Sequence, residues 1–242
     1  MIRRMVPLLA LFAVVGAVRA ETPRRSQERA VFNTPGGDIV FVFYPDVAPN
    51  TVRQFLRLVG EGVYDSTYFG RLEANFVLQL FTAEDRRVPL TERQANLLKP
   101  IKAEFSKLPH RRGILSMARL DGDVDSASSS FSILLGPAPH LDGKYTIFGE
   151  VEKGMDVVDE LCKVPVEGNK PKIRLEVAKA IVVASPRQLS ELNLVAAHPV
   201  DLSALPAAHP PGSEIPLAFA GGIILIVGGG TLCFFLSDRL PR

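Results

Sequence analysis

The fold is decided by the run Phe69-Gly70-Arg71-Leu72-Glu73-Ala74-Asn75-Phe76-Val77-Leu78-Gln79. One cation, one aromatic ring and one amide occur here on an otherwise apolar strand pattern, at Arg71, Phe76 and Gln79. A guanidinium group is always charged and presents several donors in a fixed fork. The pattern therefore favours a site that polarises a bond without breaking it.

The N-terminal residues 1–20 have the pattern of a secretory signal peptide. Arg3 and Arg4 precede an apolar run at residues 6–18, and Val18-Arg19-Ala20 offers small residues at the spacing of a cleavage site. An uncleaved anchor is the alternative, although the run is shorter than the ~20 residues that a membrane-spanning helix needs. Residues 21–30 would then form a short N-terminal extension of the exported part.

Residues 216–236 carry no charged side chain and are long enough to cross a bilayer as one helix. Glu214 precedes this segment, and Arg239 and Arg242 follow it. The positive-inside rule therefore places the short tail, residues 237–242, in the cytoplasm. We expect a single-pass membrane protein whose domain is extracytoplasmic, either periplasmic or on the cell surface.

A linker is expected between the domain and this helix, at residues 184–215. Prolines interrupt any long periodicity there, at positions 186, 199, 206, 210 and 211. A short helix at about residues 187–194 is an alternative for part of the segment. The linker would let the domain move in a shell near the membrane.

Residues 31–183 carry the alternating patterns of strands. Residues 31–34, a turn at 35–38 and residues 39–44 indicate a β-hairpin. Apolar residues recur at helical spacing after Pro49, which predicts a helix that ends at about Gly60. The apolar residues at positions 155, 157, 158 and 161 predict a second, short helix. Further strands are expected at residues 114–117, 131–135, 145–151 and 173–177. Many strands with only two helices imply a closed antiparallel sheet whose ends the helices cover.

Two further motifs are Arg112-Gly113-Ile114-Leu115-Ser116-Met117-Ala118-Arg119 and Leu141-Asp142-Gly143-Lys144-Tyr145-Thr146-Ile147-Phe148-Gly149-Glu150-Val151. Both resemble the cyclophilins, a family of peptidyl-prolyl cis-trans isomerases, and especially their bacterial members. The opening run is similar to the catalytic strand of this family, in which Phe-His-Arg is followed by Phe and Gln, with Gly70 in place of the His. The resemblance covers residues 31–183. It implies a mainly β fold, the closed eight-stranded antiparallel cyclophilin barrel capped by two α-helices.

The resemblance also implies that Arg71 is the catalytic residue of an isomerase. Rotation about the prolyl peptide bond needs no covalent step, because its barrier of ~18–20 kcal/mol comes from amide resonance. A donor at Arg71 would stabilise the twisted state, while Gln79 would hold the substrate carbonyl or orient Arg71. Proline-containing polypeptide segments are the expected partners, besides the membrane. The substrate-binding positions that the resemblance implies are Phe76, Val77, Gln79, Met117, Ala118, Arg119, Ser130, Ser132, Leu141 and Tyr145. The apolar floor for the proline ring would consist of Phe76, Val77, Met117 and Leu141, and Ala118 and Arg119 would meet the peptide backbone.

Several positions depart from the family pattern. Ser130 replaces a glutamine, and Ser132 replaces an aromatic residue that helps to hold the substrate proline. His140 replaces an apolar residue, and Tyr145 replaces a histidine, as in bacterial members.

Three interpretations of the function stay open. The protein is an isomerase that assists extracytoplasmic folding, with its activity weakened by these changes; or it is a non-catalytic module that binds proline-containing segments or scaffolds a membrane assembly; or its groove is vestigial and its outer surface binds a partner.

Other kinds of site have weaker support in the sequence. The formal net charge of +2 is mild and no basic block alternates with aromatic residues, so no nucleic-acid partner is expected. Asp121, Asp123 and Asp125 alternate as calcium ligands do, but the glycine and the closing glutamate of a calcium loop are absent, so a solvated acidic loop is the default. The histidines lack the spacing of metal ligands, and the serines around residues 126–130 lack the context of a hydrolase nucleophile. No cofactor and no metal are predicted.

Overall fold

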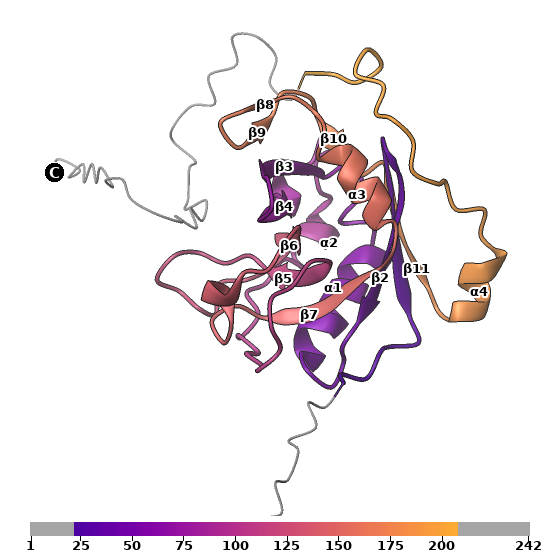
Figure 1. The fold of residues 1–242 in the computed structure, drawn as a ribbon. Helices are drawn as coiled ribbons and strands as arrows, with labels where there is room; N and C mark the ends of the chain where they lie inside the picture. The colour runs from indigo at the N-terminus through magenta and orange to yellow at the C-terminus, as the bar shows by residue number, and fades with distance from the viewer. Residues whose placement is uncertain (1–21, 208–242) are drawn as a thin grey trace, which may run out of the picture.

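The computed structural model describes residues 22–207, in which the alternating apolar runs form eleven short strands (Figure 1). Their bounds are β1 Arg29–Thr34, β2 Gly37–Phe43, β3 Tyr68–Glu73, β4 Val77–Leu80, β5 Ile114–Met117, β6 Phe131–Leu134, β7 Ile147–Lys153, β8 Val166–Glu167, β9 Lys170–Pro171, β10 Leu175–Glu176 and β11 Lys179–Val183. Nine of them form one antiparallel sheet in the order β10-β3-β4-β6-β5-β7-β2-β1-β11, and β8 and β9 pair separately. The mainly β fold is therefore confirmed.

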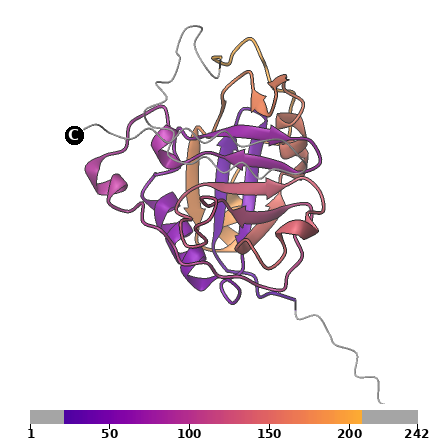
Figure 2. The same cartoon turned by 90° about the vertical axis from the view of Figure 1, so that its left-hand side faces the viewer.

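The sheet curls so that its strands form two crossing layers. Figure 2 shows the magenta and rose strands β3, β4, β5 and β6 in front of β1, β2 and β11, whose direction they cross. The two end strands come from one segment: β10 pairs with β3, and after Val177 and Ala178 the chain continues as β11, which pairs with β1. The expected closed barrel of eight strands is not confirmed. Because the last segment is divided between two neighbours, the hydrogen-bonded order has nine strands and two ends.

Four α-helices accompany the sheet within residues 22–207: α1 Pro49–Gly60, α2 Glu92–Ala95, α3 Met155–Leu161 and α4 Pro186–Glu191. Two were expected in the domain, and α4 lies where a short helix was the alternative for part of the linker. The bounds of α1 and α3 agree with the prediction, and Pro49 lies in the first turn of α1. α1 contacts β7 and β11, and α3 contacts β2. The additional helix α2 is a single turn that Thr91 and Gln94 stabilise with a capping box.

The main core is a cluster of aromatic rings inside the curl. Phe55 on α1 contacts five other rings at centroid distances between 4.9 and 6.2 Å: Phe32, Phe43, Tyr64, Phe131 and Phe148. All six rings are at most 2% exposed. Rings of this size remove a large apolar area from water. They fix α1 to strands from both layers of the sheet.

The run from Phe69 to Gln79, in which the sequence has an apolar strand pattern, forms a hairpin of two strands. β3 ends at Glu73 and β4 begins at Val77. Asn75 in the turn has a φ of +60°, in the left-handed region that asparagine tolerates. The register of the hairpin places Arg71 directly opposite Gln79.

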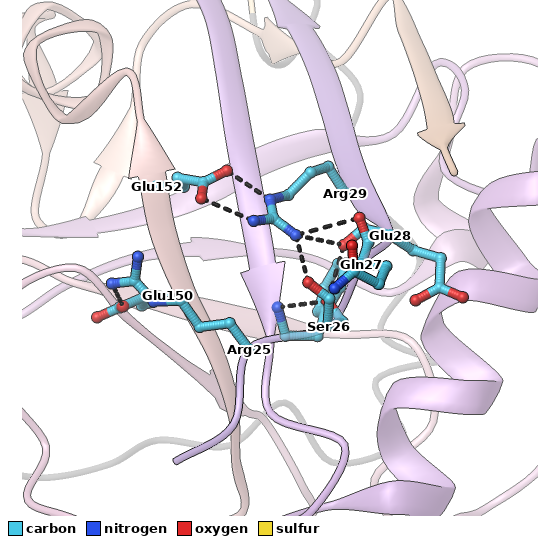
Figure 3. Close-up of polar contacts among 8 residues, drawn as sticks. Arg25, Ser26, Gln27, Glu28, Arg29, Glu150 and Glu152 are labelled. Atoms are coloured by element: carbon cyan, nitrogen blue, oxygen red, sulfur yellow. Dashed lines mark hydrogen bonds and ion pairs between the residues drawn. The ribbon is translucent and has the colours of Figure 1, made fainter. Parts of the chain in front are cut away.

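Two arginines tie the start of the domain to β7: Arg25, which precedes β1, and Arg29, the first residue of β1 (Figure 3). The guanidinium of Arg29 donates to both carboxylate oxygens of Glu152, and Arg25 forms an ion pair with Glu150. Nη1 of Arg29 also donates to the backbone oxygens of Ser26, Gln27 and Glu28. Part of the expected N-terminal extension therefore packs on the sheet, and β1 begins at Arg29, two residues before the expected start of the domain at Val31.

Residues 184–207, expected as the first part of the linker, also contact the domain. α4 contacts β11, and the backbone N–H of Asp38 donates to the oxygen of Val195 at 2.9 Å. Ala207 forms an isolated bridge with Ile173. The prolines interrupt regular structure here without preventing these contacts.

Three of the expected segments lie outside the described residues: the signal peptide at 1–20, the transmembrane helix at 216–236 and the tail at 237–242. Between residues 22 and 207, none of the helices has the length and apolar character that crossing a bilayer requires.

Candidate active site

Four polar side chains lie in one row across the face of the sheet that is turned away from the main core. Arg71 on β3 is opposite Gln79 on β4, and Gln79 is opposite Ser132 on β6. Ser132 is in turn opposite Ser116 on β5. Directly opposite residues of antiparallel strands share one face. Their sequence neighbours point into the main core, among them Leu72, Leu78, Ile133 and Leu115.

Arg71 is fixed at one end of this row. It is 4% exposed. Its Nη1 donates to Oε1 of Gln79 at 3.1 Å, and its Nε and Nη2 donate to Oε1 of Glu73 at 3.0 and 2.5 Å. A buried guanidinium needs such partners, because an unpaired buried charge is costly. Glu73 was not among the predicted site residues, although the period of two residues along a strand places it on the same face as Arg71.

Gln79 connects Arg71 to Ser130. While its Oε1 accepts from Arg71, its Nε2 donates to Oγ of Ser130 at 3.3 Å. The hydroxyl of Ser130 donates to the backbone oxygen of Leu80 at 2.7 Å. Both ends of the amide are engaged, so in this arrangement Gln79 orients Arg71.

A second apolar cluster lies beside the row, separate from the main core. It contains four of the positions that the resemblance assigns to substrate binding: Phe76, Val77, Leu141 and Tyr145. The ring centroid of Phe76 lies 5.3 Å from that of His140 and 5.9 Å from Cζ of Arg71. An apolar surface next to a fixed guanidinium is the arrangement that a proline ring and its amide nitrogen require.

The other predicted positions lie on β5 or directly after it. Met117 packs in the main core, so the structure does not place it in the apolar floor; the alternation of β5 points it away from Ser116. The backbone N–H of Ala118 donates to the oxygen of Ser130 at 3.0 Å. Cζ of Arg119 lies 4.5 Å from the ring centroid of Tyr145, and its buried Nε has no hydrogen-bond partner in residues 22–207. Arg119 therefore lies over Tyr145, a member of the apolar cluster, with its Nε buried.

Gly70 and Ser132, which depart from the family pattern, have different surroundings. A Cβ atom at position 70 would lie 2.5 Å from the ring of Phe81, so this ring occupies the space of a side chain there. Ser132 is 7% exposed and lies between Gln79 and Ser116. It continues the polar row where the family has an aromatic ring.

His110 ties the segment that carries Leu141 to β5. Its Nδ1 lies 2.8 Å from Oδ1 of Asp142 and its Nε2 lies 3.1 Å from Oγ of Ser116. A carboxylate only accepts, so Nδ1 carries the proton and Nε2 accepts from the Ser116 hydroxyl. This is the order of a nucleophile, a base and an orienting acid. Ser116 is 3% exposed on a strand between two others, and its hydroxyl is engaged with His110. The spacing of these three residues in the sequence gave no signal of their contact.

Burial lowers the pKa of His110 below its usual range, although the hydrogen bond and the charge of Asp142 oppose this effect. The pKa of the Asp142 carboxyl is also lowered, chiefly by the hydrogen bond that the backbone N–H of His110 donates to it. The structure therefore favours neutral His110 beside ionised Asp142.

Lowering the pH from about 7.5 to about 5.5 should destabilise the protein through His110. The unfolded chain, in which a histidine has a pKa of about 6.5, binds a proton that the folded state resists. Stability should thus fall as the pH drops through about 6.5, until the lowered pKa of the folded state is passed. Thermal unfolding at several pH values should show a shallower slope for His110→Gln than for the wild type. The exposed His198→Gln should keep the wild-type slope, and identical slopes for all three proteins would contradict this account.

The acidic loop makes local hydrogen bonds. Oδ1 of Asp125 accepts from the backbone N–H of Ala103 at 2.8 Å, and Oδ1 of Asp123 accepts from that of Asp125 at 3.0 Å. Across residues 22–207, no three His, Cys, Asp or Glu side chains are grouped as a metal site would require.

Comparison with known proteins agrees with this geometry. Residues 29–182 match the family model of the cyclophilin type peptidyl-prolyl cis-trans isomerase/CLD. A peptidyl-prolyl cis-trans isomerase of Arabidopsis thaliana is 44% identical over 167 residues, which cover 67% of this chain and 74% of the relative. A probable peptidyl-prolyl cis-trans isomerase of Brucella abortus is 32% identical over 155 residues, which cover 62% and 79% of the two chains.

Solved structures show the same fold. A cyclophilin type isomerase of Cryptosporidium parvum, determined in the presence of the dipeptide Ala-Pro, has a TM-score of 0.56 at 24% identity, over 64% of this chain and 98% of that one. A cyclophilin from Hirschia baltica has a TM-score of 0.56 at 20% identity, over 70% and 77% of the two chains. With the motifs, the curled sheet and the match over residues 29–182 in agreement, the chain belongs to the cyclophilin-type peptidyl-prolyl cis-trans isomerase family.

Proposed function

We propose that this protein isomerises prolyl peptide bonds at Arg71, and that it does so outside the cytoplasm, anchored to a membrane, as an aid to protein folding. The family relationship supports the reaction. One observation carries the assignment of the site: the buried guanidinium of Arg71 is held by Glu73 and Gln79 at the edge of the apolar cluster that contains Phe76.

The reaction requires stabilisation of a twisted amide. When the C–N bond rotates, resonance is lost, and the prolyl nitrogen becomes pyramidal and gains a lone pair that a donor can address. Arg71 supplies an N–H donor that is always charged, and Gln79 limits the directions in which it points. Because this donor is oriented before the substrate arrives, little reorganisation is needed in the transition state.

The apolar cluster and Arg119 would hold the substrate on either side of the rotating bond. The proline ring would lie on Phe76 and Leu141, next to Arg71. The guanidinium of Arg119, which lies over the Tyr145 ring, would donate to a backbone oxygen of the bound peptide. One part of the peptide is then fixed while the other rotates.

Refolding of a protein that is limited by prolyl isomerisation tests this function. Uncatalysed isomerisation takes roughly 10–100 s at 25 °C, so a catalyst should shorten the slow phase in proportion to its concentration. Acceleration by the wild type and its loss in Arg71→Ala would support the proposal. A slow phase that neither protein changes would refute it.

The location rests on the sequence patterns of residues 1–20 and 216–236. Fusions to a reporter enzyme that is active only outside the cytoplasm distinguish the possibilities. A fusion after residue 207 should be active and a fusion after Arg242 inactive. Equal activity of the two fusions would reject the proposed topology.

A non-catalytic binding module is the second candidate, because two positions facing the site carry serines. Both serines are buried. Ser130 accepts a hydrogen bond from Gln79, and Ser132 extends the polar row, so less apolar surface is left for the proline ring. Such a module would bind a proline peptide without accelerating its isomerisation. Binding that saturates, together with an unchanged isomerisation rate, would favour this candidate.

A further inference from the structure

A cavity of about 490 Å³ lies next to the polar row but outside it. Most of its lining comes from three parts of the chain: the β3–β4 hairpin, α3 with the segment after it, and the β8–β9 hairpin. Each part contributes lining residues, for example Asn75, Cys162 and Val166 in that order. Leu72 and Leu135 add apolar lining. The volume is within the range of roughly 300–1,000 Å³ of small-molecule pockets, so a long side chain has room to enter.

Glu73 belongs to both the cavity and the candidate active site. It lines the cavity, and its Oε1 accepts from Arg71. The same Oε1 lies 3.5 Å from Nδ2 of Asn169, whereas no residue between 22 and 207 donates to Oε2. The side chain of Glu73 is 34% exposed. A ligand in the cavity can therefore reach a carboxylate oxygen that the described residues leave open.

The charges around the cavity favour a cationic ligand. Three charged side chains line it: Glu73, Arg112 and Asp159. Nη2 of Arg112 donates to both carboxylate oxygens of Asp159, at 2.7 and 2.8 Å, so these two charges neutralise each other. The third charged side chain of the lining, Glu73, is negative, and its Oε1 pairs with Arg71, which does not line the cavity. A second cation would find an acceptor there, and an acidic group would be repelled.

We infer that this cavity is a subsite for a basic side chain, lysine or arginine, near the proline of the substrate. The inference rests on the proposed isomerase function. A basic group at Oε2 of Glu73 competes with Arg71 for the negative charge of the carboxylate. The donors of Arg71 are then directed more fully to the prolyl nitrogen. The subsite thus both selects basic segments and raises the rate at which their prolyl bonds isomerise.

The contact requires only a short stretch of substrate. An extended chain advances roughly 3.3–3.6 Å per residue, so residues within three positions of the proline can reach beyond Arg71 to Glu73. Glu73 follows Arg71 by two residues on the same face of β3, which keeps the two subsites adjacent.

Peptides that differ at one residue test this inference. Each contains Ala-Pro and carries lysine, methionine or glutamate at one of the three positions before or after this pair. With the full-length wild type, the lysine peptide should have a kcat/KM about two- to five-fold above that of the methionine peptide at one position or more, and the glutamate peptide should be slowest. In Glu73→Gln the lysine and methionine peptides should react at equal rates, and the rate of the methionine peptide should rise.

Glu61→Gln is the matched control. Glu61 also pairs with an arginine, Arg93, and its side chain is 31% exposed, but it follows α1 and does not line the cavity. This variant should keep the preference for lysine. Binding to Arg71→Ala gives a second readout that needs no turnover: the lysine peptide should still bind more tightly than the methionine peptide, since Glu73 is present.

The outcomes separate the inference from the function on which it rests. Turnover without a preference for lysine in the wild type, or a preference that persists in Glu73→Gln, would overturn the subsite and leave the isomerase in place. Absence of turnover on every peptide would instead reject the proposed function.

Discussion

Replacing Arg71 with alanine should lower kcat/KM for an Ala-Pro peptide by about 100-fold or more, because one preorganised donor to a transition state is worth that much. The variant loses the only cation that Gln79 orients in residues 22–207 and keeps the apolar cluster. Peptide binding should therefore weaken less than turnover, and the loss should appear mainly in kcat. Steady-state rates over a range of peptide concentrations separate the two terms.

Two further variants show whether the position of the donor matters as well as its charge. Arg71→Lys keeps the charge but lacks the planar fork through which Gln79 directs the donors, so it should be intermediate in rate. Arg87→Ala removes an arginine whose side chain is 65% exposed and paired with Glu176, and it should react like the wild type. If Arg71→Ala retained the wild-type kcat, Arg71 would not be the catalytic residue.

Replacing Phe55 with alanine should lower the free energy of unfolding by about 3–5 kcal/mol. The ring is 2% exposed and contacts five others, so its removal leaves a cavity at the centre of the core. For a domain of about this size, the expected fall in Tm is about 6–20 °C. Calorimetry or the loss of circular dichroism on heating measures it.

The control for this effect is Phe105→Ala, because Phe105 is 43% exposed and belongs to no buried cluster. Its Tm should change by no more than about 2 °C. Well below the melting temperature, Phe55→Ala should keep most of its activity, since Phe55 packs on the core side of the sheet and the polar row lies on the other. A Tm near that of the wild type would mean that the aromatic cluster does not hold the two layers together.

Periodicity and turn chemistry were sufficient for some of the local elements. Helix α1 follows from Pro49 and the apolar spacing after it, and the hairpin of β1 and β2 follows from the turn between its strands. The pairing order could not be obtained in this way. β6 lies between β4 and β5, and the last segment pairs with both β3 and β1, because these contacts depend on how the sheet curls around the core.

The candidate site was predictable where motif and strand face agree. Arg71, Gln79 and Val77 lie on the expected face, whereas Met117 lies on the opposite face of β5, in the main core. A sequence motif gives the residue types and their spacing, but it does not give the direction in which each side chain points. Glu73 could have been found from the alternation along β3, while His110 required the packing of segments distant in sequence.

The most direct test of the central claim is the exchange rate between the cis and trans forms of an Ala-Pro peptide at equilibrium, measured by NMR with and without the full-length protein. Uncatalysed exchange takes tens to hundreds of seconds. Exchange should become faster in proportion to the concentration of wild-type protein and should stay near background with the same concentration of Arg71→Ala. An exchange rate that the wild type leaves unchanged, at concentrations where the peptide binds, would contradict it.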